Sequence, residues 1–285
     1  MINTVKSFLM IGQSNMAGRG YLKDVKPIYD EQIKKLVNGR WQVMTEPINF
    51  DRPNSGASLA ASFAAAWRLN NPDEQIGLIP CAEGGSGIDD WEVNGPLFKH
   101  AVLQAKLAQS ISKLEGILWH QGENDSSEGR YSFYYEKIKV IADAFREELD
   151  IPDIPFIVGG LGDFLTDGKY GAYFTEYENI NRELQKFADI TPHTYFVTAA
   201  RLTANVDNIH FNAVSLRKLG IRYFEAYNFR KNVPEPLADE DEIINIIQNR
   251  PLTEHEKTAL LEISISKGEL SPGSFDKENY VGLIR

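Results

Sequence analysis

Three residue types that together perform acyl transfer occur at two distant points of the chain. Ser14 lies two residues beyond Gly12, after an apolar run, where a sharp turn can present its hydroxyl as a nucleophile. Asp207 and His210 are three residues apart, a spacing that lets the carboxylate hydrogen-bond to the imidazole and leaves the far ring nitrogen free as a base. Each residue alone also fits a structural role, such as a helix-capping serine. Together they predict nucleophilic catalysis if the two segments meet.

Groups that could stabilise a developing oxyanion follow two other apolar runs. The pair 84–85 is Gly-Gly, which lets a backbone N–H approach a ligand closely. Gln121 and Asn124 each carry an amide that can donate a hydrogen bond to an oxyanion. In the same segment, His120 and Glu123 offer either a second base and acid or a structural network that holds the loop. These groups complete the requirements of acyl transfer.

Three further features have competing interpretations. Gly12, Gly18 and Gly20 form a glycine-rich loop of the kind that cradles phosphates, but their spacing matches neither the dinucleotide nor the nucleoside-triphosphate pattern. Trp91 is a candidate for an aromatic wall beside the site, with core packing as the alternative. Cys81 is expected to be a buried, unreactive thiol, because no base lies near it in the sequence.

Short apolar runs alternate with segments of helical periodicity along most of the chain. Such runs suit strands that are covered on both faces, and we predict five of them, at 5–11, 75–80, 116–120, 155–158 and 194–198. Their alternation with helices favours a mostly parallel sheet with helices on both faces. In such a sheet, chemistry is expected at the carboxyl ends of the strands, where the candidate residues fall.

The helical segments are predicted from apolar residues repeated every three or four positions. We expect five such stripes to bury one face against the sheet: Leu59, Phe63, Ala66 and Trp67; Leu103, Leu107, Ile111 and Leu114; Tyr134, Ile138, Ile141, Phe145 and Leu149; Tyr173, Tyr177, Ile180, Leu184 and Phe187; and Leu216, Leu219, Tyr223 and Tyr227.

The composition argues against several classes of protein. Of 285 residues, 30 are Lys or Arg and 40 are Asp or Glu, and the formal charge of −10 disfavours binding to nucleic acid or anionic lipid through a basic face. The single cysteine excludes an intrachain disulfide. No apolar run approaches the roughly 20 residues that span a bilayer, and the first residues lack the pattern of an export signal. We expect a cytoplasmic protein, with its oligomeric state open, a homo-oligomer included.

The last part of the chain differs from the rest. A proline-containing junction at 231–236 and an acidic run at 239–242 precede two short amphipathic segments, at 242–249 and 253–266. The acidic run is interpreted as a helix start, where carboxylates are favoured. The sequence therefore predicts a domain over 1–233 and a small helical extension over 234–285, of unknown role.

Four sequence blocks resemble those of the SGNH hydrolase superfamily, in particular its carbohydrate esterase family 6 and sialate O-acetylesterase branch. The blocks are GQSNM at 12–16, EGGS at 83–86, WHQGE at 119–123 and DNIHF at 207–211. The resemblance runs from about residue 4 to 230. It implies a flavodoxin-like, three-layer α/β/α fold, which the run pattern would build on a mostly parallel five-stranded sheet. It also implies hydrolysis of acetyl esters on carbohydrates without a metal or other cofactor.

The resemblance implies roles for individual residues. Ser14 would be the nucleophile, His210 the general base and Asp207 its orienting acid, with Glu123 as a supporting or alternative acid. The oxyanion hole would combine the backbone N–H groups of Ser14 and Gly85 with a side chain of the third block. This chain departs there from the superfamily's Gly-x-Asn-Asp pattern. In the HQGE version Gln121 is the expected donor, and Asn124 is the alternative.

The expected function is therefore that of a serine esterase that removes acetyl groups from an acetylated oligosaccharide, such as a xylan fragment. A sialate O-acetylesterase and a general hydrolase of small esters are the alternatives within the same class. A non-catalytic carbohydrate- or phosphate-binding module would lack a nucleophile, base or acid, and none is missing.

Overall fold

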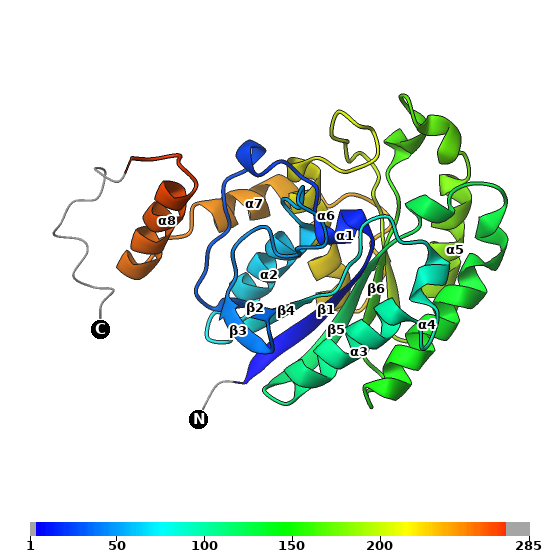
Figure 1. Cartoon of the computed structure of the whole chain (residues 1–285), viewed down its shortest axis with the longest axis horizontal. Helices are drawn as coiled ribbons and strands as arrows, with labels where there is room; N and C mark the ends of the chain where they lie inside the picture. Colours follow the sequence, from blue (N-terminus) through cyan, green and yellow to red (C-terminus); the bar gives the residue numbers. More distant parts are fainter. Residues whose placement is uncertain (1–3, 272–285) are drawn as a thin grey trace.

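A mostly parallel sheet forms the middle layer of the structure, and helices cover both of its faces (Figure 1). The computed structural model describes residues 4–271. The sheet has 7 strands in the order β3-β2-β4-β1-β5-β6-β7. All neighbours pair in parallel except β2 and β3, which form an antiparallel hairpin. The strands are β1 Val5–Gly12, β2 Ile33–Val37, β3 Arg40–Val43, β4 Ile76–Pro80, β5 Ser112–His120, β6 Phe156–Gly159 and β7 Thr194–Val197.

The prediction of a five-stranded sheet is wrong because it omits the β2–β3 hairpin. The five predicted strands correspond to β1, β4, β5, β6 and β7. The missed hairpin lies at the edge of the sheet, where one side is open and polar residues replace the continuous apolar runs of the central strands. Asn38 and Gly39 join its strands, both with positive φ, and this dipeptide is a strong hairpin signal.

Successive residues of β1 point into two separate hydrophobic cores. Phe8 and Met10 pack into one core with α2 and α6, whereas Leu9 and Ile11 pack into the other with α3, α4 and α5. The longer helices are α2 Leu59–Asn70, α3 Pro96–Gln109, α4 Tyr134–Glu148, α5 Tyr177–Ile190 and α6 Ala213–Phe229. The predicted three-layer α/β/α arrangement is confirmed, with α2 and α6 on one face and α3, α4 and α5 on the other.

One predicted helical face is wrong. Leu103 and Leu107 of α3 are exposed, and so is Ile111, which follows that helix. Tyr173, which precedes α5, is exposed as well. Leu114, the last member of the α3 stripe, belongs to β5 instead. The face of α3 that meets the sheet carries the small residues Ala101, Ala105 and Ala108. These let the helix approach the sheet closely, which a stripe counted by large apolar residues does not detect.

The described chain is helical after residue 234, as the sequence predicts, whereas the division into two domains at residue 233 stays a prediction. This part contains α7 Glu240–Gln248 and α8 Glu254–Ser266, and residues 272–285 of that prediction lie outside the described part of the chain. Helix α7 packs against the core, and Arg222 of α6 forms a buried ion pair with Glu240 at 2.5 Å. Helix α8 lies farther out, beyond α7 (Figure 1).

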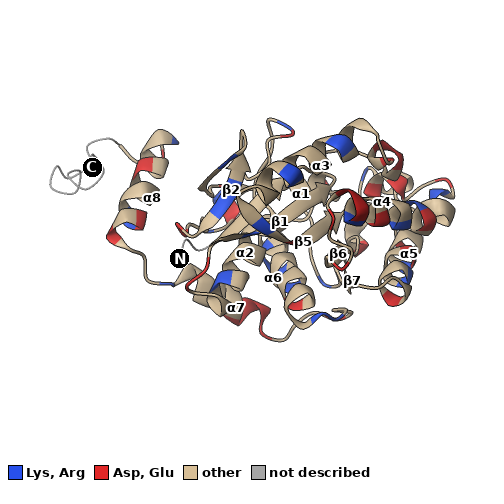
Figure 2. Ribbon diagram, turned by 90° about the horizontal axis from the view of Figure 1, so that it is seen from below, with Lys and Arg blue, Asp and Glu red and all other residues tan. Residues whose placement is uncertain are grey.

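Charged residues lie mainly on the outer helices, where acidic and basic positions are interspersed along the ribbon (Figure 2). The central strands carry few of them in the same view. Over residues 4–271, no helix combines the length and apolar character that crossing a membrane requires.

Candidate active site

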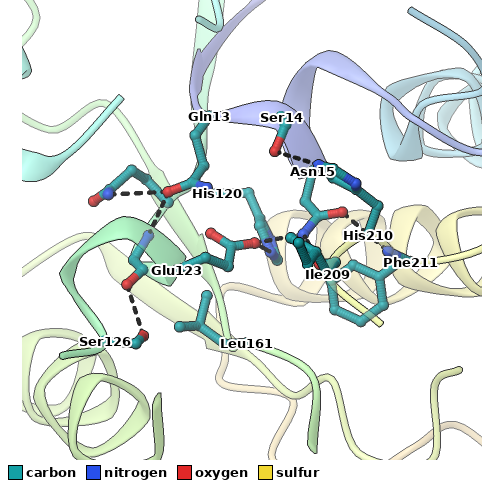
Figure 3. A network of polar contacts seen from close by, with 12 residues as sticks. Gln13, Ser14, Asn15, His120, Glu123, Ser126, Leu161, Ile209, His210 and Phe211 are labelled. Carbon is teal, nitrogen blue, oxygen red and sulfur yellow. Dashed lines mark hydrogen bonds and ion pairs between the residues drawn. The ribbon is translucent and has the colours of Figure 1, made fainter. Parts of the chain in front are cut away.

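Ser14, His210 and Asp207 form a continuous chain of hydrogen bonds. Figure 3 shows its first link, between Ser14 and His210. The Ser14 Oγ and His210 Nε2 atoms are 2.9 Å apart, and the His210 Nδ1 and Asp207 Oδ2 atoms are 2.8 Å apart. Ser14 begins the short helix α1 (Ser14–Ala17) directly after β1. The turn between them needs Gly12, whose φ is +125° and whose Cβ would lie 2.2 Å from the carbonyl oxygen of His120. Two segments separated by 196 residues therefore meet at one point.

The loop around Asp207 holds its carboxylate in one orientation. The Oδ1 atom accepts hydrogen bonds from the N–H groups of Ile209, at 2.9 Å, and His210, at 3.0 Å. Burial alone would raise the pKa of Asp207, but the hydrogen bonds from the His210 ring and from these two N–H groups outweigh it and lower the pKa to about 2. The side chain is therefore ionised at neutral pH and holds the proton of His210 on Nδ1, which leaves Nε2 free to accept a proton from Ser14.

Ser14 and His210 open onto a cleft of about 390 Å³. The cleft lies at the carboxyl ends of β1, β4 and β5, the edge of the sheet where chemistry is expected. Its lining includes polar, charged and aromatic side chains from several loops: Gln13, Ser14, Arg19, Arg52, Asn54, Gly84, Gly85, Glu123, Asn124, Phe174, Ile209 and His210.

Two backbone N–H groups are available to an oxyanion in this cleft. Ser14 is the first residue of α1, so its N–H has no acceptor within the helix. Gly85 is exposed in the cleft with φ of +82°. Among residues 4–271, neither N–H has a hydrogen-bond acceptor. Both predicted backbone donors therefore lie in the same cleft as the Ser14 hydroxyl.

Gln121 cannot serve as the side-chain donor, so that prediction is wrong. Its side chain is fully buried and does not line the cleft. The two hydrogens of its Nε2 group are shared among three acceptors, Gln13 Oε1, Ser86 O and Asp125 Oδ2, at 2.7 to 3.1 Å. Asn124, the alternative, is exposed and lines the cleft. The geometry therefore favours the Asn124 amide over that of Gln121.

Gln13 is a candidate donor that the sequence interpretation missed. Its Oε1 accepts from Gln121 Nε2 at 3.1 Å and from the N–H groups of Gly122 and Asn124, each at 3.4 Å. Because backbone N–H groups are obligate donors, the amide oxygen must face them, and the Nε2 group is left without an acceptor among the described residues. Gln13 lines the cleft beside Ser14. Its position directly before Ser14 was the available signal.

Glu123 supports the site indirectly (Figure 3). Its Oε1 accepts from Asn15 Nδ2 at 2.5 Å, and Asn15 Oδ1 accepts from the N–H of Phe211 at 3.1 Å. Burial raises the pKa of Glu123, although the hydrogen bond from Asn15 opposes this. Asp207, and not Glu123, is the carboxylate that hydrogen-bonds to His210. Glu123 thus joins the segment after β5 to the loop that carries His210.

His120 belongs to the structural network and not to the proton-transfer chain. Its ring is fully buried, and burial lowers its pKa to about 3. The Nδ1 atom lies 3.1 Å from the hydroxyl of Tyr223, which itself donates to the carbonyl of Trp119 at 2.6 Å. Since that hydroxyl proton is already committed, His120 donates through Nδ1.

The prediction that Trp91 forms an aromatic wall of the site is wrong. Trp91 is fully buried, its Nε1 donates to Ser86 Oγ at 3.0 Å, and its ring packs edge-to-face with Trp119. The aromatic ring that does line the cleft is that of Phe174, which is half-buried. Cys81 is buried, and burial raises the pKa of its thiol, as the sequence predicts.

The glycines after β1 do not form a phosphate-binding loop. An added Cβ on Gly18 would lie 2.6 Å from the carbonyl oxygen of Ala57, and one on Gly20 would lie 2.6 Å from the Cα atom of Ala213. These glycines let backbone segments pack against one another. Their N–H groups already donate to the carbonyl groups of Ser14 and Ala57, so neither is free to bind a phosphate.

Comparisons with known proteins agree with this architecture. The family described as "Carbohydrate esterase, sialic acid-specific acetylesterase" matches residues 4–228. A probable carbohydrate esterase of Arabidopsis thaliana is 27% identical over 242 residues, which cover 77% of this chain and 89% of that protein. The crystal structure of that Arabidopsis protein superposes with a TM-score of 0.71 at 24% identity, over 79% of this chain and 98% of that one.

More distant solved structures share the fold. The structure of NanS matches with a TM-score of 0.65 at 19% identity, over 81% of this chain and 99% of that one. A carbohydrate acetylesterase from Xanthomonas citri matches with a TM-score of 0.58 at 20% identity, over 78% of this chain and 55% of that one. On the extent of the family match, this chain is a carboxylic ester hydrolase that belongs to the sialic acid-specific acetylesterase family of carbohydrate esterases.

Proposed function

We propose that this protein hydrolyses O-acetyl esters of neutral carbohydrates, acetylated xylan fragments among them, through a Ser-His-Asp triad. Ser14 is the nucleophile, His210 the general base and Asp207 the residue that orients it. The observation that carries this proposal is the hydrogen-bonded chain from Ser14 Oγ through the His210 ring to Asp207, at 2.9 and 2.8 Å, at the floor of an open cleft.

The reaction follows from this geometry in two halves. His210 Nε2 takes the proton of Ser14 as Oγ attacks the acetyl carbonyl, and the resulting oxyanion accepts hydrogen bonds from the N–H groups of Ser14 and Gly85. The amides of Gln13 and Asn124 can add further donors, and removing one such donor typically costs about 3 kcal/mol. The protonated His210 then donates its proton to the departing sugar oxygen. Water, activated by His210, hydrolyses the acetyl-enzyme and restores Ser14.

The charges of the cleft favour a neutral sugar over an acidic one. Two arginines line it, and each already has a carboxylate partner: Arg19 pairs with Asp51 at 2.5 Å, and Arg52 pairs with Glu83 at 2.7 Å. Neither cation is left unpaired for a substrate carboxylate. Phe174 offers an aromatic surface on which a sugar ring can pack.

Acetate release from a panel of esters tests the proposal. We expect wild-type protein to release acetate from acetylated xylo-oligosaccharides and 4-nitrophenyl acetate, and more slowly from O-acetyl sialic acid. Ser14→Ala should abolish release from every ester, whereas Ser110→Ala, which changes an exposed serine at the end of α3, should not alter it. Near-normal turnover by Ser14→Ala would refute the mechanism, and a preference for the sialic acid ester would refute the assignment to neutral sugars.

A further inference from the structure

Two consecutive residues hold both polar groups of Gly84, in the loop that follows β4. The N–H of Gly84 donates to Asp51 Oδ2 at 2.9 Å, and the carbonyl of Gly84 accepts from an Arg52 guanidinium nitrogen at 3.0 Å. Asn49 adds a third contact to the same loop, because its Nδ2 donates to the carbonyl of Ala82 at 3.0 Å. These three hydrogen bonds from the segment 49–52 therefore fix the backbone of the loop.

The contact from Arg52 determines where the next N–H points. The carbonyl of Gly84 and the N–H of Gly85 belong to one planar peptide unit, in which they point in opposite directions when the bond is trans. A cation that fixes the carbonyl on one side therefore fixes the N–H of Gly85 on the other. If this peptide unit rotated by half a turn, a carbonyl oxygen would face the cleft and repel an oxyanion.

Asp51 is a rigid anchor for this arrangement. Its side chain is 2% exposed and accepts hydrogen bonds from Arg19, Asn49 and Ser55 in addition to Gly84. Position 84 also has no room for a side chain, since a Cβ there would lie 2.4 Å from a guanidinium nitrogen of Arg19 and 2.6 Å from Asp51 Oδ2.

The Arg52 side chain is partly exposed, but intramolecular contacts hold its guanidinium in place. Its side chain is 50% exposed, and its guanidinium also donates to the carbonyl of Asp51 at 3.0 Å and forms an ion pair with Glu83 Oε1 at 2.7 Å. With its charge compensated and its orientation fixed, Arg52 donates a charge-assisted hydrogen bond to the Gly84 carbonyl. A bond of this kind polarises the whole peptide unit and strengthens its N–H as a donor.

We propose that Asp51 and Arg52 are positioning residues that lock and polarise the Gly84–Gly85 peptide unit, so that the Gly85 N–H stabilises the transition state of ester hydrolysis. This inference rests on the proposed function, in which that N–H belongs to the oxyanion hole. Neither side chain needs to touch the substrate. Arg52 instead acts through the backbone on the affinity for the tetrahedral state, and should not affect binding of the ground-state ester.

The alternative role for Arg52 is to bind an anionic group of the substrate. The contacts with Glu83, Asp51 and Gly84 use its guanidinium for intramolecular bonds and disfavour that role. The two roles differ in kinetics. A positioning residue changes kcat for all esters, whereas an anion-binding residue changes KM for acidic esters alone.

The test compares Arg52→Met and Arg52→Lys with Arg182→Met, a control that removes an exposed, ion-paired arginine from α5. Losing one oxyanion donor costs 10²- to 10³-fold, so misorienting one should lower kcat by about tenfold in Arg52→Met, with KM changed less than about twofold. An alkylboronic acid forms a tetrahedral adduct with the nucleophile, and its inhibition constant should rise by the same factor as kcat falls. Arg52→Lys should be intermediate, and Arg182→Met should match the wild type.

Three outcomes would overturn the inference, and they are distinguishable. If wild-type protein is active and Ser14→Ala is not, but Arg52→Met keeps both kcat and boronic acid affinity, Arg52 has no positioning role and the proposed function stands. A rise in KM confined to acidic esters would assign Arg52 to anion binding. Absence of any ester hydrolysis by wild-type protein would overturn the proposed function and this inference together. A melting temperature within about 2 °C of wild type would exclude a general loss of structure as the cause.

Discussion

Replacing Asp207 with asparagine should damage catalysis more than replacing it with alanine, although asparagine is the closer match in shape. The N–H groups of Ile209 and His210 donate to Asp207 Oδ1, so the carbonyl oxygen of an asparagine would take that position. Its NH₂ group would then face His210 Nδ1, which lies 2.8 Å from Asp207 Oδ2. The ring would have to accept at Nδ1 and carry its proton on Nε2, where it cannot take the proton of Ser14.

The magnitude follows from two contributions. An imidazolium–carboxylate pair about 4 Å apart is worth about 4 kcal/mol at an effective dielectric constant of 20 and about 1 kcal/mol in water. The side chains of His210 and Asp207 are 19% and 35% exposed, which puts the loss on removing the charge at about 2.7 kcal/mol, or about 10²-fold in kcat. Turning the asparagine into the productive orientation breaks two hydrogen bonds of about 1 kcal/mol each, a further factor of about 30.

We therefore expect Asp207→Ala to lose about 10²-fold in kcat and Asp207→Asn about 3 × 10³-fold. The assay is 4-nitrophenyl acetate hydrolysis at about pH 8, above the ordinary titration range of histidine. A matched control is Asp153→Asn, because Asp153 forms a surface pair with His193 at 3.3 Å. Nitrogen NMR of the His210 ring would report the tautomer directly. If Asp207→Asn turned over faster than Asp207→Ala, the orientation argument would be refuted.

Four further predictions concern other parts of the molecule. Gln13→Ala and Asn124→Ala should each lower kcat by about 10²-fold with little change in KM, as steady-state kinetics would show. Phe174→Ala should raise KM for acetylated oligosaccharides but not for 4-nitrophenyl acetate, because Phe174 lines the cleft. Trp91→Ala should instead lower the free energy of unfolding by about 3–5 kcal/mol in a denaturant titration, because Trp91 is fully buried. Asp207 has a folded pKa of about 2, below its unfolded value of about 3.9. Its contribution to the stability of the fold is therefore full above about pH 4 and is lost only as the pH falls toward 2. Because this contribution is intact at about pH 5, activity lost at that pH should return when the pH is raised. Glu240→Gln should destabilise the fold by about 3–5 kcal/mol, measured in the same way, because it leaves Arg222 buried without its partner.

The central strands and the reactive residues were predictable because local patterns encode them. A continuous apolar run identifies a strand that is covered on both faces, and a polar residue after such a run must face a cleft or find a buried partner. These patterns put Ser14 and the block around Gln121 at the carboxyl edge of the sheet. The β2–β3 hairpin lacks a continuous apolar run, because its strands lie at the sheet edge.

Which member of a polar block faces the cleft was not predictable in the same way. Gln121 and Asn124 carry the same amide and differ by three positions, and only the local turn decides between them. In the folded chain Gln121 turns inward to bind Gln13, Ser86 and Asp125, while Asn124 remains in the cleft. Trp91 failed as a prediction for a similar reason, because an aromatic residue near a site fits a core and a binding wall equally well.

Gln13 and Asn15, on either side of Ser14, hold three segments that are distant in the sequence in fixed relative positions. Gln13 accepts hydrogen bonds from the segment after β5 through its Oε1. Asn15 donates to Glu123 in that same segment, and also to the carbonyl of Ile209, at 3.3 Å, in the loop that carries His210.

The nucleophile therefore lies between two amides that tie its turn to the segments holding the oxyanion donor and the base. Each amide is nearly fully buried, and a buried amide without partners is costly, so these bonds select one relative placement of the three segments. We therefore expect Asn15→Leu to move Ser14 and His210 apart, although it replaces neither residue. Expressed as free energies, its loss in kcat should exceed its loss in the free energy of unfolding, because the apolar side chain still fills the core. The loop that carries His210, in contrast, loses its hydrogen bonds to residue 15.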